Sequence, residues 1–202
     1  QMGQVPLLTR EQEVEISKRI EEAENEVKRI IYAFGFTGKE HIALAEKLIS
    51  EPPKERFDRV IVDKKIESRE RHLKSLRRLV KDVRAIDHKV DEKYLSQLKA
   101  KNQSALTRAK KAHNENNTKL QKSFVKFFYK QKVIEEMSVV AENVHDKVVG
   151  GLSAVVKASK ARKTAATKTL IDTESRKLKA LEIFVRMPAT DYVESYDQLQ
   201  HF

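Results

Sequence analysis

The sequence predicts an all-α protein, an antiparallel bundle of long helices with coiled-coil-like packing. The 202 residues include only five glycines and four prolines, while 35% are charged and 40% are hydrophobic, a balance that is typical of long helices. The hydrophobic residues also recur every three or four positions, the spacing that places side chains on one face of a helix. A chain of this length can form one large domain or two small ones.

The first long helix is predicted over residues 10–34, where the apolar residues alternate between spacings of four and three. They are Ile16, Ile20, Ala23, Val27, Ile30 and Phe34. Thr9 and Gln12 stand at the spacing of a capping box, in which each side chain accepts a hydrogen bond from the other residue's backbone amide. Glu11 and Glu13 fall in the first turn, where the helix dipole favours negative charge. Local chemistry alone therefore specifies the start of this helix.

Gly35 is expected to end the first helix, and a shorter helix should follow and end at Pro52 and Pro53. Thr37 and Glu40 stand at the spacing of a second capping box. We expect these two helices to form an antiparallel pair. Residues 54–63 indicate a helix start or an ordered loop, because a single run of strand-forming residues stands alone there: Val60, Ile61 and Val62.

A long basic helix is predicted over residues 63–92, with apolar residues in a three-four pattern along one side. Its outer face offers five candidates for contact with DNA or with another protein: Arg71, Lys74, Arg77, Arg78 and Lys81. Residues 99–119 are polar, and we expect a connection or a solvent-facing helix end there.

The densest aromatic cluster follows, interleaved with lysines, and comprises Leu120, Phe124, Phe127, Phe128 and Tyr129. Such a mixture could stack the bases of single-stranded nucleic acid. The helical spacing of Leu120, Phe124 and Phe127 favours burial in the core instead.

The pair Gly150 and Gly151 is predicted to form a turn between helices. A helix should then run over residues 152–185 and end before Pro188. A last helix should begin near Thr190 and continue to Phe202.

The net charge of +11 is unevenly distributed. Residues 54–132 contain 24 basic and 10 acidic residues, whereas residues 1–53 have a net charge of −3 and residues 133–202 a net charge of 0. A basic block of this kind can attract a phosphate backbone or an acidic protein face. A solvated helix surface explains it equally well.

The sequence contains no recognisable constellation for catalysis or metal binding. It has no cysteine, no G-x-S-x-G motif and no glycine pattern of a P-loop or dinucleotide site. The six histidines never stand at a metal-ligand spacing. We therefore expect no enzyme activity, metal, cofactor or small-molecule substrate. The lack of a long apolar run, a signal peptide and cysteine predicts a cytoplasmic protein with no membrane partner.

Residues 2–21 begin with Met2-Gly3, continue through Leu7-Leu8-Thr9-Arg10-Glu11 and enter a helix that reads Lys18-Arg19-Ile20-Glu21. This stretch resembles region 1.2 of the primary (housekeeping) sigma factors of bacterial RNA polymerase. Two looser similarities, at residues 57–61 and 176–182, are to the helical insert that follows region 1.2 in some of these factors. The resemblance divides the chain into a region 1.2-like segment with the first long helix, residues 1–34, and the helical insert, residues 35–202, which would end just before region 2.

In these factors, region 1.2 contacts promoter DNA downstream of the minus-ten element and cooperates with region 2 in melting the promoter. The resemblance therefore implies a transcription initiation factor that directs RNA polymerase to promoters, with the polymerase core and promoter DNA as partners. The residues implied in DNA contact are Met2, Gly3, Leu7, Leu8, Thr9, Arg10, Glu11 and Glu13. The insert would act as a scaffold, and its basic face would meet upstream DNA or an acidic polymerase surface.

We expect the chain to be a fragment. In the family, an aromatic and a basic residue stand directly before the motif, and region 2 follows the insert. This sequence includes neither those two preceding residues nor region 2. Alone, it should bind neither core polymerase tightly nor promoter DNA specifically. The alternative interpretation is a helical coiled-coil scaffold that joins protein partners and has no role in transcription. That alternative leaves the opening motif unexplained.

Overall fold

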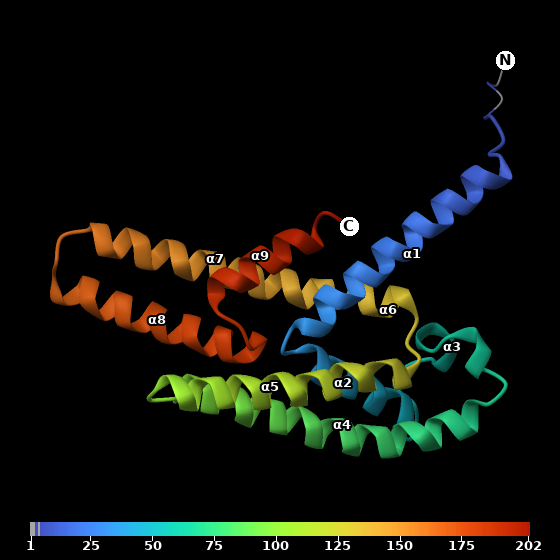
Figure 1. Cartoon of the computed structure of the whole chain (residues 1–202), viewed down its shortest axis with the longest axis horizontal. Helices are drawn as coiled ribbons and strands as arrows, with labels where there is room; N and C mark the ends of the chain where they lie inside the picture. The colour runs from blue at the N-terminus through green and yellow to red at the C-terminus, as the bar shows by residue number, and fades with distance from the viewer. Residues whose placement is uncertain (1–2, 4) are drawn as a thin grey trace.

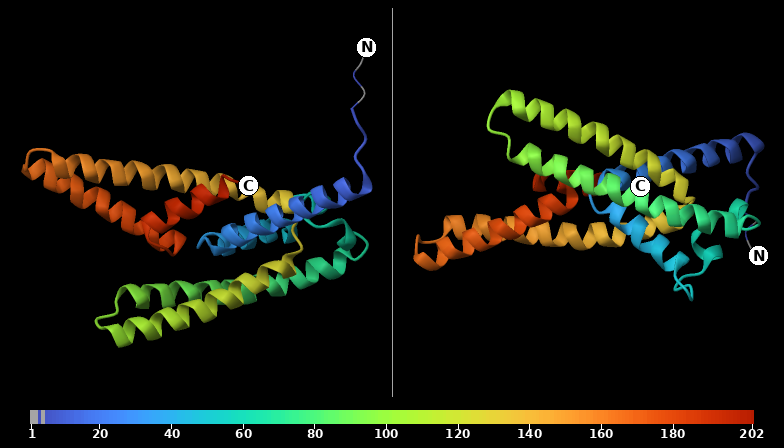
Figure 2. Two further views of the ribbon diagram at one scale, coloured as in Figure 1. Left: turned by 45° about the horizontal axis from the view of Figure 1, so that its top comes forward. Right: turned by 90° about the horizontal axis from the view of Figure 1, so that it is seen from below.

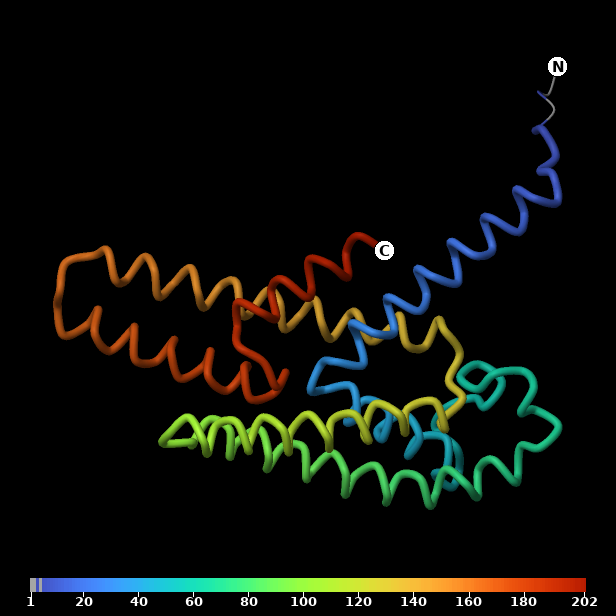
Figure 3. The backbone as a smooth tube through the Cα atoms, viewed as in Figure 1, coloured from blue at the N-terminus to red at the C-terminus, as the bar shows by residue number. Residues whose placement is uncertain are grey.

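Apart from short connections, the chain folds into helices (Figure 1). The structure, a computed structural model, describes residue 3 and residues 5–202, and these residues contain no β-strand. Two long helical hairpins, α4–α5 and α7–α8, extend toward the same end of the molecule, and α1 projects from the other end (Figures 1 and 3). The predicted all-α class is confirmed, whereas coiled-coil packing stays a prediction.

Helix α1 (Arg10–Ala33) begins and ends close to the predicted positions. Only its second half is buried, since Ile31 is fully buried while Ile20 is 54% exposed. In Figure 1 the first half projects away from the other helices. The apolar stripe is therefore continuous in the sequence, but only its C-terminal half packs against the rest of the protein.

Helix α2 (Thr37–Ile49) is present, but the capping box predicted for Thr37 and Glu40 is not. No side chain caps this helix, and the buried Thr37 hydroxyl instead donates a hydrogen bond to the backbone oxygen of Ile31 at 2.5 Å. Thr37 thus closes the end of α1 rather than the start of α2. The main packing partner of α2 is α4 rather than α1, which differs from the predicted pairing of the first two helices.

The ambiguous segment that follows contains α3 (Phe57–Val60) and a short 3-10 helix, η1 (Asp63–Lys65). Ile61 makes an isolated antiparallel bridge with Tyr129. The backbone amide of Val62 donates a hydrogen bond to the oxygen of Phe128 at 2.9 Å. Residues 60–62, the strand-forming run, therefore pair with the aromatic segment through one isolated β-bridge.

Helices α4 (Arg69–Leu98) and α5 (Gln103–Phe124) form the first hairpin. Residues 103–119, predicted to be a connection or a helix end, lie in a long helix that packs along α4. The Asn102 side chain caps this helix and accepts a hydrogen bond from the Ala105 amide at 2.8 Å. The apolar pattern weakens here because small or polar residues occupy five of the six partly buried positions of residues 103–119: Ala105, Ala109, Ala112, Asn116 and Asn117.

The aromatic segment belongs to the core. Phe124, Phe127 and Tyr129 are buried around His41 of α2, whose ring stacks on Phe124 with the centroids 4.4 Å apart. The interpretation as core is confirmed, and these buried rings cannot form a stacking platform for nucleic acid. The chain then passes through η2 (Val125–Phe127), Phe128 with a left-handed φ of 56°, and α6 (Gln131–Glu136).

Helix α7 (Ser138–Lys160) continues through Gly150 and Gly151, so the predicted turn there is wrong. Gly151 faces α8, and a Cβ at this position would lie 2.9 Å from Leu178 Cδ2. Glycine therefore allows the two helices to approach closely. The turn lies at residues 161–164, where Thr164 opens α8 (Ala165–Val185) with a capping box. The single helix predicted over residues 152–185 is thus parts of two helices.

Helix α9 (Ala189–Leu199) ends at Leu199, whereas the sequence predicted a helix that continues to Phe202. Its Tyr192 is fully buried, and the hydroxyl donates a hydrogen bond to the backbone oxygen of Ala141 at 2.5 Å. The Tyr192 ring also packs against Phe34, with the centroids 5.1 Å apart. Helix α9 therefore joins α7 to the end of α1.

A buried ion cluster holds the turn between α8 and α9 against α4. Arg186, with a left-handed φ of 56°, places its Nη2 2.5 Å from Asp87 Oδ1 and its Nε 2.8 Å from Asp91 Oδ1. Lys39 Nζ of α2 lies 3.0 Å from Asp87 Oδ2. A Cβ at Gly38 would lie 2.8 Å from Asp87 Oδ1, so glycine leaves room for the cluster. Both aspartates therefore have partners, as buried charges require.

Candidate nucleic-acid interface

The residues ahead of α1 form an extended and exposed segment, here called the lead-in, residues 5–9. Leu7 is 96% exposed and Leu8 is 51% exposed. A Cβ at Gly3 would meet nothing within 4 Å. Met2, which the resemblance implies in the same contact, lies outside the described residues. The lead-in therefore offers apolar side chains that are available to a partner.

Thr9 fixes the point where the lead-in becomes a helix. The Gln12 amide donates a hydrogen bond to Thr9 Oγ1 at 3.2 Å, and the Thr9 amide donates one to Gln12 Oε1 at 2.9 Å. The predicted capping box is therefore present. Arg10, Glu11 and Glu13 are exposed in the first turn, so the Arg10 guanidinium is available beside the lead-in.

The predicted basic residues of α4 form one exposed stripe, here called the α4 basic face: Arg71, Lys74, Arg77, Arg78 and Lys81. Spacings of three and four place them on one side of the helix. Buried apolar residues, among them Leu76 and Val80, occupy the opposite side. Arg77 Nη2 lies 3.4 Å from Glu51 Oε1, and the other four residues form no ion pair within residues 5–202. Because four of its five cations are unpaired, the face stays positive.

The lead-in and the α4 basic face lie on different sides of the molecule. In Figure 1 the lead-in stands beyond the projecting end of α1, whereas α4 runs along the lower edge. The structure therefore keeps the two groups of predicted residues apart. A partner that contacts both has to be extended.

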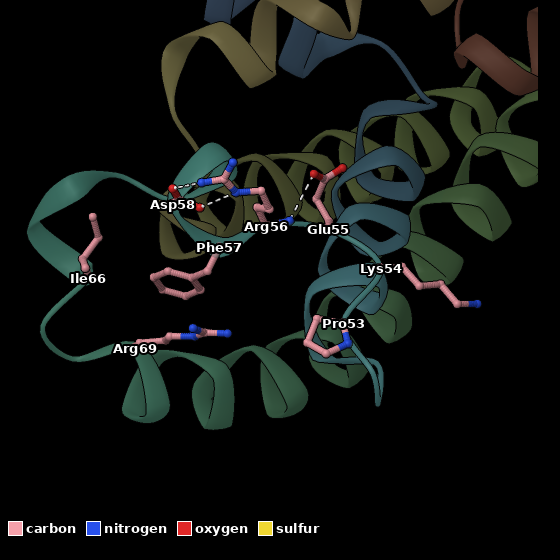
Figure 4. A pocket seen from close by; sticks show the side chains of 8 residues that line it. All are labelled: Pro53, Lys54, Glu55, Arg56, Phe57, Asp58, Ile66 and Arg69. Carbon is pink, nitrogen blue, oxygen red and sulfur yellow. Dashed lines mark hydrogen bonds and ion pairs between the residues drawn. The ribbon is translucent and has the colours of Figure 1, made fainter.

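A pocket of about 500 Å³ opens beside the start of α4 (Figure 4). Its acidic residues are occupied, since Arg56 Nη2 lies 2.7 Å from Asp58 Oδ2 and Arg59 Nε lies 2.8 Å from Glu55 Oε1. Hydrogen bonds from these arginines lower the pKa of Asp58 and the pKa of Glu55. Carboxylates held ionised in this way are poorly suited to general acid catalysis. The remaining lining residues are Pro53, Lys54, Phe57, Ile66 and Arg69.

The exposed basic and apolar groups of the lead-in and of α4 form surfaces of the described part of the chain. Within it, no group of three or more His, Cys, Asp or Glu residues is placed to hold a metal ion. Among residues 5–202, no helix has the length and apolar character needed to cross a membrane. The available groups of the candidate interface are cations and apolar side chains, which suit binding.

The sequence prediction did not single out two further basic groups at the free ends of the hairpins. Residues 93–114 and residues 147–171 each contain six basic residues and no acidic residue. Neither group is visible when the charge is summed over residues 1–53, 54–132 and 133–202, because acidic residues elsewhere in each block are counted with them. A search for long runs without aspartate or glutamate finds them from the sequence alone.

Residues 1–26 match the family model described as sigma-70 factor, region 1.2. The matched residues include the lead-in, the capping box and the exposed half of α1. No solved structure matches the chain. The match supports a sigma-70 family factor that acts in transcription initiation, on the strength of one short segment.

Proposed function

We propose that the chain is part of a primary sigma factor, which directs bacterial RNA polymerase to promoters. The observation that carries this proposal is the region 1.2 match over residues 1–26. It coincides with the part of α1 that is not packed against the rest of the protein. Sigma factors are not a class of enzyme, and we propose no catalytic role.

The lead-in is proposed to contact promoter DNA just downstream of the minus-ten element, on the non-template strand. Leu7 and Leu8 expose apolar surface that can pack against a base or a sugar, and Arg10 supplies a positive charge for a phosphate. The Thr9 cap would brace these contacts, because it fixes the direction in which the chain enters α1. Gly3, which has open space around it, and Met2 belong to the same proposed contact.

The proposed protein partner is the RNA polymerase core. In this proposal residues 1–34 form the region 1.2-like segment, and residues 35–202 form a helical insert whose antiparallel helices pack as in a coiled coil. The insert acts as a scaffold beside the promoter-binding part of the factor. The α4 basic face would meet upstream DNA or an acidic surface of the polymerase, and its four unpaired cations support this role.

Site-specific crosslinking in a reconstituted holoenzyme tests the proposal. A photoreactive side chain at Leu7 should crosslink to the non-template strand of an open promoter complex. The same group at Val125, which is 64% exposed on η2, should not. Placed at Arg71 or Arg78, it should crosslink to upstream DNA or to the polymerase.

A holoenzyme that opens the promoter without any DNA crosslink from Leu7 would contradict the proposed contact. If the chain also fails to join the polymerase, the alternative of a scaffold that connects other proteins is favoured. Crosslinks from Leu7 with none from the α4 basic face would show that this face is only solvated. The proposed contact would then be limited to the lead-in.

A further inference from the structure

The positive charge of the chain is concentrated at the free ends of the two hairpins. The α4–α5 end, residues 93–114, and the α7–α8 end, residues 147–171, together contain twelve basic residues and no acidic residue. Since the net charge of the whole chain is +11, the remaining residues have a net charge of −1. The basic residues of the first end are Lys93, Lys99, Lys101, Arg108, Lys110 and Lys111. Those of the second run are Lys147, which lies near the middle of α7, and five residues closer to the free end: Lys157, Lys160, Arg162, Lys163 and Lys168.

The fold leaves these charges exposed and brings the two ends to one side. All twelve residues except the partly buried Lys93 are exposed. None of them forms an ion pair within residues 5–202, whereas Arg77 and Arg84 in the middle of α4 pair with glutamates. Both hairpins extend in the same general direction in every view (Figures 1 and 2). The charges are therefore available to a partner that approaches from that end.

The side chains, rather than the helix dipoles, make these ends positive, because each end joins the C-terminus of one helix (α4 or α7) to the N-terminus of the next. Helices α5 and α8 both begin there, capped by Asn102 and Thr164, and neither has an acidic residue in its first turn. Helix α1, in contrast, has Glu11 and Glu13 in its first turn. The start of α5 and of α8 therefore has no carboxylate in its first turn that would repel a phosphate, while the dipole charge there is opposed by the C-terminus of the preceding helix.

We infer that the two hairpin ends bind the phosphate backbone of double-stranded nucleic acid without reading its sequence. A duplex presents a row of phosphates, and contacts to it come from lysine, arginine and small polar side chains. The residues between the cations are mainly of that kind or small, such as Asn102, Ser104, Ser159 and Thr164. This inference does not rest on the region 1.2 match.

The composition of the two ends disfavours other partners. The only Phe, Tyr or Trp of the two ends is Tyr94, which is buried at 4% exposure. Proteins that bind single strands stack the bases on aromatic side chains, and neither end exposes one. Protein interfaces commonly depend on tyrosine or tryptophan anchors, and neither end exposes these either. Charge without anchors is typical of backbone binding.

Fluorescence anisotropy tests the inference. The full chain is titrated into a labelled duplex of about 30 base pairs and mixed sequence, at salt concentrations between about 50 and 300 mM. One variant changes the α4–α5 end (Lys99→Gln, Lys101→Gln, Lys110→Gln), and another changes the α7–α8 end (Lys160→Gln, Arg162→Gln, Lys163→Gln). A matched control removes three exposed lysines elsewhere (Lys122→Gln, Lys126→Gln, Lys132→Gln). All six positions at the ends are exposed and unpaired, so the helical content should stay unchanged.

Each hairpin variant should weaken duplex binding about tenfold and reduce the slope of log affinity against log salt by about 2 to 3, because up to three phosphate contacts are lost. The control should leave the slope close to that of the unchanged chain. Equal losses in all three variants would overturn the assignment to the hairpin ends. Absence of duplex binding at the lowest salt, or tighter binding of a labelled polyglutamate with the same number of charges, would overturn the choice of partner.

Discussion

The two halves of α1 carry the same apolar stripe and have opposite surroundings. Ile20 and Ile31 lie about three helical turns apart and therefore on the same face. Ile31 is completely buried, while Ile20 is 54% exposed. The buried half packs against α6 and α9, and the exposed half belongs to the segment that matches region 1.2. Periodicity therefore identifies the face of a helix, but the fold decides how much of that face is covered.

A matched pair of truncations tests this comparison most strongly. Ile31→Ala should lower the free energy of unfolding by about 2–5 kcal/mol, because it removes buried methyl groups and leaves a cavity. Ile20→Ala should change it by about 0.5 kcal/mol or less, since the side chain lies mostly in water. Urea unfolding followed by circular dichroism measures both. Equal losses would mean that the first half of α1 is packed in solution.

The buried half of α1 also helps to enclose a histidine that should make stability depend on pH. Tyr32 lies edge-on to His41, with the ring centroids 5.9 Å apart. Burial lowers the pKa of His41 from its usual 6.5 to about 4. Between these two values the unfolded chain binds a proton that the folded chain does not, so stability falls as the pH is lowered through this window. The loss should reach roughly 3 kcal/mol by about pH 4.

Denaturant titrations at a series of pH values check this effect, and His41→Phe is the matched variant because it keeps an aromatic ring among Phe124, Phe127 and Tyr129. The variant should lose much of the slope between about pH 6.5 and pH 4. Some slope should remain, since burial also lowers the pKa of His72 and of His113. A slope that is the same with and without His41 would show that its ring is accessible to protons in the folded chain.

The features that could be predicted from the sequence depend on neighbouring residues in the chain. The capping box of Thr9 with Gln12 needs only four consecutive residues, and it is present. The α4 basic face follows from the helical spacing of its residues and is exposed as a stripe. Burial of Phe124 and Phe127 was also predicted, because their spacing favours one covered side.

The features that could not be predicted depend on residues far away in the sequence. Gly151 looks like a turn residue, yet it lies in a helix because it packs against Leu178 of α8. Thr37 looks like a helix cap, yet its hydroxyl bonds to the end of α1. The shared position of the two hairpin ends was not predicted either, because it also depends on contacts between distant parts of the sequence. The turn at residues 161–164 has neither glycine nor proline, and only the structure brings the two acid-free runs to the same end.

The smallest expected effect concerns the exposed half of α1, where the cap is the local source of order. Thr9→Ala removes the oxygen that accepts from the Gln12 amide and should destabilise the first turn by about 1 kcal/mol. Because this half is exposed, the loss should appear as fraying rather than as global unfolding. Amide hydrogen exchange in the first turn should accelerate about fivefold, with the midpoint of urea unfolding unchanged. Thr9→Ser keeps the hydroxyl and should therefore retain the slow exchange. A shifted midpoint of urea unfolding in Thr9→Ala would instead show that the capped end packs against the other helices.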